Sequence, residues 1–159
     1  MSKFHELSVL ATKYSRAFFA DKSKCGRLAS LVMRDYAMYL GCPVENVEFL
    51  HRDENLKPTG QVVPFNGIVP MVRDGEGFWH FCARVRLDGA DQDAYAHDLL
   101  KLSLNLQGDT LSVREGKEFK ANASDLTTLV PFFDYLYESS RMGYESPLSN
   151  PGKRIGFVV

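Results

Sequence analysis

Residues 99–121, which read LLKLSLNLQGDTLSVREGKEFKA, decide the fold. Within 100–107, leucines alternate with polar side chains, and this period of two is typical of a β-strand with one buried face. Leucine favours helices, but that weak preference does not outweigh the alternation. Two turn sequences follow, Gly108-Asp109 and Glu115-Gly116-Lys117, so the chain is expected to reverse direction twice. The stretch therefore predicts a meander of short antiparallel strands.

Further strand patterns lie upstream of this meander. Residues 78–87 alternate in the same way, with one apolar face and one polar face. The turn sequence Asp74-Gly75-Glu76-Gly77 leads into them and indicates a hairpin, and residues 47–50 form another short strand. We therefore expect an antiparallel sheet of about five strands within residues 47–121.

Helical periods flank the predicted sheet. Apolar residues recur every three or four positions in 3–20 and again in 23–40, and Gly41 marks the end of the second run. Polar residues at 21–25 separate the two runs. This pattern predicts a helical hairpin over residues 1–41.

A further helix is expected over residues 124–143, with Pro131 either kinking it or starting its main part. Its predicted buried stripe consists of Leu126, Leu129, Val130, Phe133, Leu136 and Tyr137. A tail over residues 146–159 follows, and its apolar end is expected to dock as an edge strand. The chain is thus predicted to be a single α+β domain with its helices packed on one face of the sheet.

Composition narrows the class of protein. The chain has 159 residues, of which 45% are hydrophobic and 25% charged, as in an ordinary globular domain. The net charge of −1 argues against a general nucleic-acid binder. No apolar run is long enough for a membrane span or a signal peptide. Three cysteines without metal-ligand spacing fit a reducing compartment, so we expect a cytoplasmic protein without a metal site.

The polar face of the predicted sheet is a candidate ligand-binding site. If the apolar faces of the strands all point to the helices, the opposite face gathers His80, Arg84, Arg86, Lys101 and Arg114. No carboxylate is expected at its central positions. Because guanidinium groups recognise carboxylate and phosphate, this face could bind an anionic small molecule or a nucleic acid.

Two other interpretations of this face stay open. It could be the solvated side of a one-sided sheet, which is common in antiparallel sheets. Alternatively, a second subunit could cover it, as the presence of Phe78 and Cys82 among the polar residues suggests.

No catalytic motif stands out in the sequence. It contains no G-x-S-x-G elbow, P-loop or dinucleotide-binding glycine pattern, and no cofactor is expected. The loop at 51–54 and the pair His97-Asp98 combine histidine with acids, as a general base requires, but polar loops are common without catalysis. The acidic stretch 88–93 lacks the order of a calcium loop and is expected to be a turn.

Aromatic residues near the C-terminus suggest a protein interface. The candidates lie off the predicted buried stripe of the last helix and are Phe132, Tyr135, Met142 and Tyr144. An exposed apolar patch of this kind marks a contact surface, and we expect a twofold homodimer. The alternative is a helix buried on two sides by the C-terminal tail.

The leading functional hypothesis is therefore a small cytoplasmic, non-catalytic protein that binds an anionic ligand or a protein partner. The enzyme alternative is a hydrolase or transferase acting on an anionic substrate through His80 with Arg84 and Arg86. A nucleic-acid-binding module is a further alternative, and it predicts an affinity that falls steeply with salt.

Overall fold

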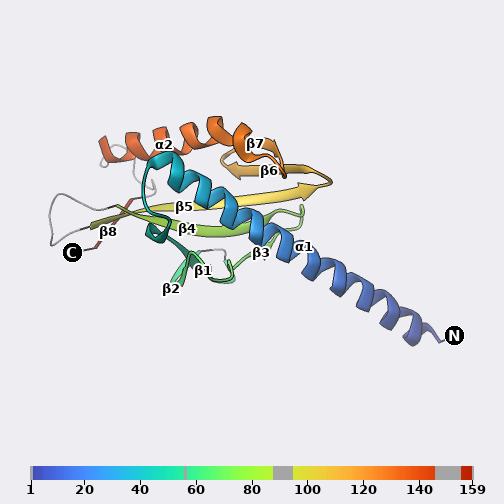
Figure 1. Ribbon diagram of the computed structural model, residues 1–159. Coiled ribbons are helices and arrows are strands. Elements are labelled where there is room, and N and C mark those ends of the chain that lie inside the picture. Colours follow the sequence, from blue (N-terminus) through green and yellow to red (C-terminus); the bar gives the residue numbers. More distant parts are fainter. Residues whose placement is uncertain (1, 56, 88–94, 146–154, 159) are drawn as a thin grey trace.

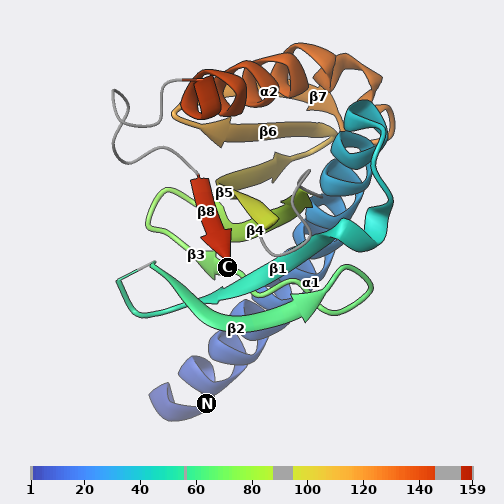
Figure 2. The same cartoon turned by 90° about the vertical axis from the view of Figure 1, so that its left-hand side faces the viewer.

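A computed structural model describes residues 2–55, 57–87, 95–145 and 155–158. The elements follow in the order α1 (Lys3–Leu40), β1 (Val47–Arg52), β2 (Pro58–Pro64), β3 (Val72–Arg73), β4 (Trp79–Leu87), β5 (Tyr95–Gln107), β6 (Thr110–Glu115), β7 (Lys117–Asn122), α2 (Val130–Glu145) and β8 (Ile155–Val158), with short 3-10 turns at Val44–Asn46 and Leu126–Leu129. Both helices cover the same face of the sheet (Figure 1 and Figure 2). The predicted α+β class is confirmed.

The sheet is antiparallel throughout, with the strand order β2-β1-β4-β5-β6-β7. Two short strands join it at the sides, β3 beside β4 and β8 beside β5. The meander expected over residues 99–121 is confirmed as β5, β6 and β7, and the C-terminal segment docks as an edge strand. The sheet has more strands than the five or so expected within residues 47–121, because residues 58–64, for which no strand was predicted, form β2.

The predicted helical hairpin is wrong, because α1 is one continuous helix from Lys3 to Leu40. Residues 21–25 contain neither glycine nor proline, so nothing in them interrupts the helical hydrogen bonds. One of their polar side chains has a partner on the sheet: the indole Nε1 of Trp79 donates a hydrogen bond to Asp21 Oδ2 at 2.8 Å. The expected stop at Gly41 is confirmed, since this residue adopts the left-handed conformation with φ 76°.

The N-terminal part of α1 projects beyond the sheet (Figure 1). A helix of 38 residues is about 57 Å long, and only its C-terminal half packs on the strands. Residues 2–17 are all exposed, and Phe18 is the first to be partly buried, with its ring centroid 5.1 Å from that of Trp79. We call residues 3–17 the arm.

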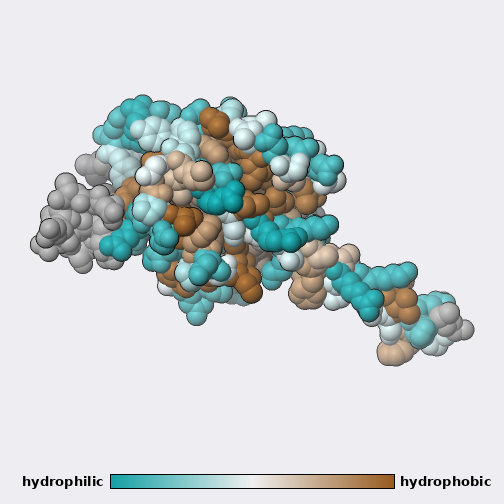
Figure 3. Space-filling model, in the orientation of Figure 1, coloured by the Kyte–Doolittle hydropathy of each residue, from teal (hydrophilic) through white to brown (hydrophobic). Residues whose placement is uncertain are grey.

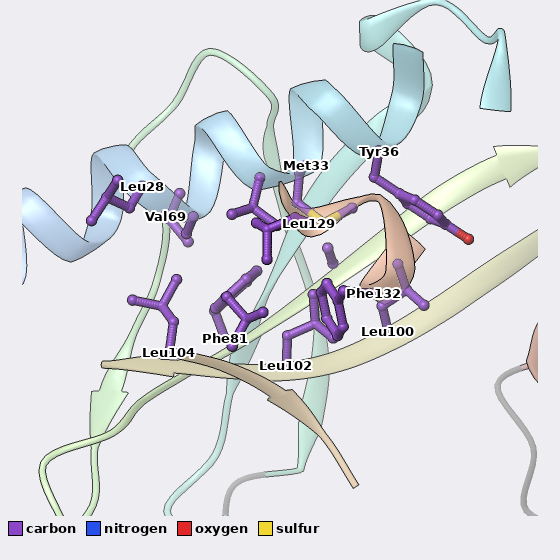
Figure 4. Close-up of a cluster of buried hydrophobic side chains, with 14 of the residues drawn as sticks. Leu28, Met33, Tyr36, Val69, Phe81, Leu100, Leu102, Leu104, Leu129 and Phe132 are labelled. Atoms are coloured by element: carbon purple, nitrogen blue, oxygen red, sulfur yellow. The ribbon is translucent and has the colours of Figure 1, made fainter. Parts of the chain in front are cut away.

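The core lies between the helices and the sheet (Figure 4). The alternation in β5 holds, because Leu100, Leu102 and Leu104 are buried while Lys101 is exposed. Phe81 on β4 lies directly opposite Leu102 in the register and shares its face. The period-two pattern therefore assigned the buried face of the central strands correctly.

The last helix is rotated relative to the expected stripe. Its buried residues are Phe132, Phe133, Leu136 and Gly143, whereas Val130 and Tyr137 are exposed. The 3-10 turn before α2 has fewer residues per turn than an α-helix. The residues of α2 that face the sheet are therefore not those expected from one continuous α-helix. Pro131 sits in the first turn of α2, where a missing N–H costs nothing. The helix ends at Glu145, two residues beyond the end expected at Gly143.

Candidate functional site

The strand register brings the predicted cationic residues to one face of the sheet. Arg84 and His80 lie on β4, and His80 is opposite Ser103 of β5. Ser103 is in turn opposite Arg114 of β6, and Lys101 is opposite Cys82. Arg86 lies on the same side of β4 as His80 and Arg84, near the end of the strand. The geometric part of the prediction, a shared face for these five side chains, holds.

The expectation that no carboxylate lies at the central positions of this face is wrong, because Glu48 meets Arg84 there. Glu48 Oε1 lies 3.1 Å from Arg84 Nε, since β1 pairs beside β4 and sets the two residues opposite each other. Asp74, from the turn before β4, lies 2.7 Å from His80 and 3.7 Å from Arg114. His80, Arg84 and Arg114 thus each already contact a carboxylate of the same chain. Within the described part of the chain, Lys101 has no such partner.

Asp74 organises the turn that leads into β4. Its Oδ1 accepts hydrogen bonds from the backbone amides of Glu76 at 2.9 Å and Phe78 at 3.0 Å. Its Oδ2 forms a hydrogen bond with the Nε2 of His80. Burial alone would raise the pKa of Asp74, but the hydrogen bonds from His80 and the two amides outweigh burial and lower this pKa.

The lowered pKa of Asp74 predicts a loss of stability in acid. A carboxyl group with a lower pKa in the folded chain stabilises the fold above the unfolded pKa of about 3.9, and this contribution disappears as the pH falls through the folded value. The free energy of unfolding should therefore decline below about pH 4. Urea unfolding between neutral and acidic pH measures this decline, and Asp74→Asn should reduce it. If the free energy of unfolding declined equally with falling pH in the wild type and in Asp74→Asn, Asp74 would not contribute to the loss of stability in acid.

Side chains of the same chain bury Phe78 and Cys82, the two residues of this sheet face that suggested a covering subunit. The guanidinium carbon of Arg114 lies 3.5 Å from the centre of the Phe78 ring, and Arg52 lies beside the Cys82 thiol. Burial raises the pKa of Cys82 in spite of the neighbouring Arg52 and Lys101, so this thiol stays protonated at neutral pH. Phe78 and Cys82 therefore need no second subunit to cover them.

The predicted aromatic interface does not form as a set. Phe132 is fully buried, with its ring centroid 5.3 Å from that of Phe119 on β7, so its expected exposure is wrong. Tyr135 is half-buried and its hydroxyl donates to the carbonyl of Glu115 at 2.8 Å. Tyr144 is half-buried, and Met142 is exposed. The side chains of Ile155 to Val159 and the acidic stretch 88–93 lie outside the part of the structure that can be described.

The structure separates His97 from Asp98 and uses the acid of the other histidine-acid candidate in a turn. His97 and Asp98 are neighbours on β5 and therefore point to opposite faces of the sheet. Burial lowers the pKa of His97, and Ser140 of α2 donates to Asp98 at 2.7 Å. In the loop at 51–54, the Asp53 carboxylate accepts backbone hydrogen bonds and shapes a turn. Across the described ranges, no three His, Cys, Asp or Glu side chains gather as metal ligands.

A groove that the sequence did not predict runs between α1 and the segment 67–69. Its volume is about 670 Å³, and its lining consists of Phe19, Lys22, Ser23, Gly26, Arg27, Ser30, Leu31, Gly67, Ile68 and Val69. The surface is mainly apolar, and the Ile68 side chain on one wall is 89% exposed. Figure 4 shows the buried Val69 beside Leu28 of α1, which places this segment against the helix.

Small residues of both elements shape the groove. Ser23, Gly26 and Ser30 share one side of α1, and their short side chains leave the space open. On the other wall, a Cβ at Gly67 would lie only 2.5 Å from Val63 Cγ1 and 3.2 Å from the Pro64 carbonyl oxygen. Because Gly67 has no side chain, the backbone can fold back closely onto Val63 and Pro64. The spacing of the three small residues was visible in the sequence, but it indicates one surface only if residues 21–25 are helical.

Comparisons with protein-family models, with curated proteins and with solved structures found no match to this chain. Of the helices in the described residues, none is both long enough and apolar enough to cross a membrane.

Proposed function

We propose that this chain is a small cytoplasmic, non-catalytic binding protein whose groove takes an acidic peptide segment of a protein partner. The observation that carries the proposal is the lining of the groove, which combines apolar walls with Lys22 and Arg27 and contains no carboxylate. Apolar walls recognise the large side chains of a peptide, and the two cations favour acidic residues beside them.

The size and charge of the groove support this proposal. Its volume of about 670 Å³ is in the range of ligand pockets. Neither Lys22 nor Arg27 forms an ion pair with a described residue, so a partner's carboxylates would meet no competing group. On the sheet face, by contrast, an anion would have to compete with Glu48 and Asp74 for the arginines. The groove is therefore the better candidate for an acidic ligand.

Selection from a random peptide library on the immobilised full chain tests the proposal. Enriched peptides should combine large apolar residues with aspartate or glutamate. Arg27→Glu should weaken the binding of such a peptide by about fivefold to tenfold, since it replaces attraction by repulsion at the rim. Fluorescence anisotropy of the labelled peptide measures the change.

The matched control is Lys120→Glu, which makes the same change of charge at an exposed residue of β7, away from the groove. It should leave the affinity unchanged. Enrichment of basic peptides, failure to enrich any peptide, or equal losses from Arg27→Glu and Lys120→Glu would each contradict the proposal.

A further inference from the structure

The arm carries an apolar stripe that no described residue covers. The exposed fraction of its side chains is 81% for Phe4, 67% for Leu7, 61% for Leu10 and 65% for Tyr14. They recur at spacings of three and four, which places them on one side of the helix. Figure 3 shows apolar residues on the surface of the projecting arm.

This stripe continues the face by which α1 packs on the sheet. Phe4 and Ala11 are followed at intervals of seven by Phe18, Cys25 and Val32, the last two of which are buried in the core. Positions seven apart are offset by only about 20° in an α-helix. The arm therefore presents the same apolar face as the packed half of α1, but beyond the edge of the sheet.

Charges beside the stripe indicate what covers it. Glu6 and Lys13 are seven residues apart and lie along the same flank of the stripe, whereas Ser8 and Ser15 lie along the other. In an antiparallel pair of identical helices, like flanks meet, so Glu6 of each copy faces Lys13 of the other. In a parallel pair, these charged residues would instead face the serines.

The length of the arm agrees with the same pairing. The two Glu6–Lys13 contacts place the twofold axis between residues 9 and 10, and the exposed arm, residues 3–17, is centred on residue 10. Each arm would then reach residue 16 of its partner, just before α1 meets the sheet at Phe18. The bodies of the two molecules are thus kept apart while the whole arm is used.

We propose that two copies of this chain associate through their arms, which pair antiparallel about a twofold axis. Covering the four apolar side chains on both copies would bury on the order of 1,000 Å², taking about 150–250 Å² for each aromatic side chain, and this reaches the lower limit of specific interfaces. Pairing also supports the arm itself, because an isolated helix of this length is only marginally stable in water. The proposal does not depend on the peptide groove, which lies on another side of α1.

Sedimentation velocity of the full chain over a range of micromolar concentrations tests the pairing. The wild type should show a reversible monomer–dimer equilibrium. Leu10→Glu should raise the dimer dissociation constant by roughly two orders of magnitude, because it places two carboxylates next to each other near the twofold axis. Val9→Glu introduces the same residue on the opposite side of the helix and should have little effect.

Charge exchange tests the orientation. Glu6→Lys and Lys13→Glu should each weaken the dimer, because each brings like charges together, and the double variant should restore the wild-type affinity. Circular dichroism establishes that each variant keeps its helix content. A monomer at all concentrations, equal effects of Leu10→Glu and Val9→Glu, or no restoration by the double variant would overturn the proposal. Binding of the arm to anionic lipid vesicles by a protein that stays monomeric would do so as well.

Discussion

Replacement of Leu102 by alanine is expected to lower the free energy of unfolding by about 2–5 kcal/mol. Leu102 is only 2% exposed and lies on the central strand β5, opposite Phe81 of β4. Its removal leaves a cavity in the middle of the core, where the surrounding strands and helices can relax only in part (Figure 4). Equilibrium unfolding in urea measures the loss.

The neighbouring residue provides the control. Lys101 points to the opposite face of β5 and is exposed, so Lys101→Ala should change the free energy of unfolding by no more than about 0.5 kcal/mol. Similar losses from Leu102→Ala and Lys101→Ala would mean that β5 is not buried on one side only.

Replacement of Asp74 by alanine is expected to cost about 2–3 kcal/mol of folding stability at neutral pH. The change removes the acceptor for two backbone amides and for the His80 ring, all at 2.7–3.0 Å. The turn between β3 and β4 then loses the side chain that holds it, and Arg114 keeps Glu76 as an ion-pair partner but loses Asp74. Thermal or urea unfolding at neutral pH measures the effect.

Two further variants separate the causes. Asp74→Asn keeps an oxygen for the two amides and should cost less than half as much as Asp74→Ala. Glu54→Ala removes an exposed carboxylate that makes no contact of this kind and should stay within about 0.5 kcal/mol of wild type. Equal losses from Asp74→Ala and Glu54→Ala would show that the hydrogen bonds of Asp74 contribute nothing.

The sheet was predictable where the sequence alternates strictly. Residues 100–107 and 78–87 show the period of two, and the structure confirms both as the central strands. The continuity of α1 through residues 21–25 was not predictable from polarity alone. The side chain of Asp21 accepts a hydrogen bond from Trp79, which is distant in the sequence, so this polar residue fits within a helix that packs on the sheet.

The candidate sites show the same limit. Strand alternation placed His80, Arg84 and Arg114 on one face, but it could not show that Glu48 and Asp74 would meet them. Those contacts depend on which strands pair and on how a turn folds back. The groove depends likewise on the path of residues 67–69 beside α1, which no local pattern determines.

The groove is the proposed binding site, and NMR titration tests this most directly. The full chain, labelled with ¹⁵N, is titrated with an acidic peptide selected on it, and the backbone amide shifts are followed. We predict that the largest changes occur at groove residues of both walls, namely Ser23, Gly26, Ser30 and Ile68. Changes centred instead on Arg84, Arg86 and Lys101 would place the ligand on the sheet face and contradict the proposed binding site.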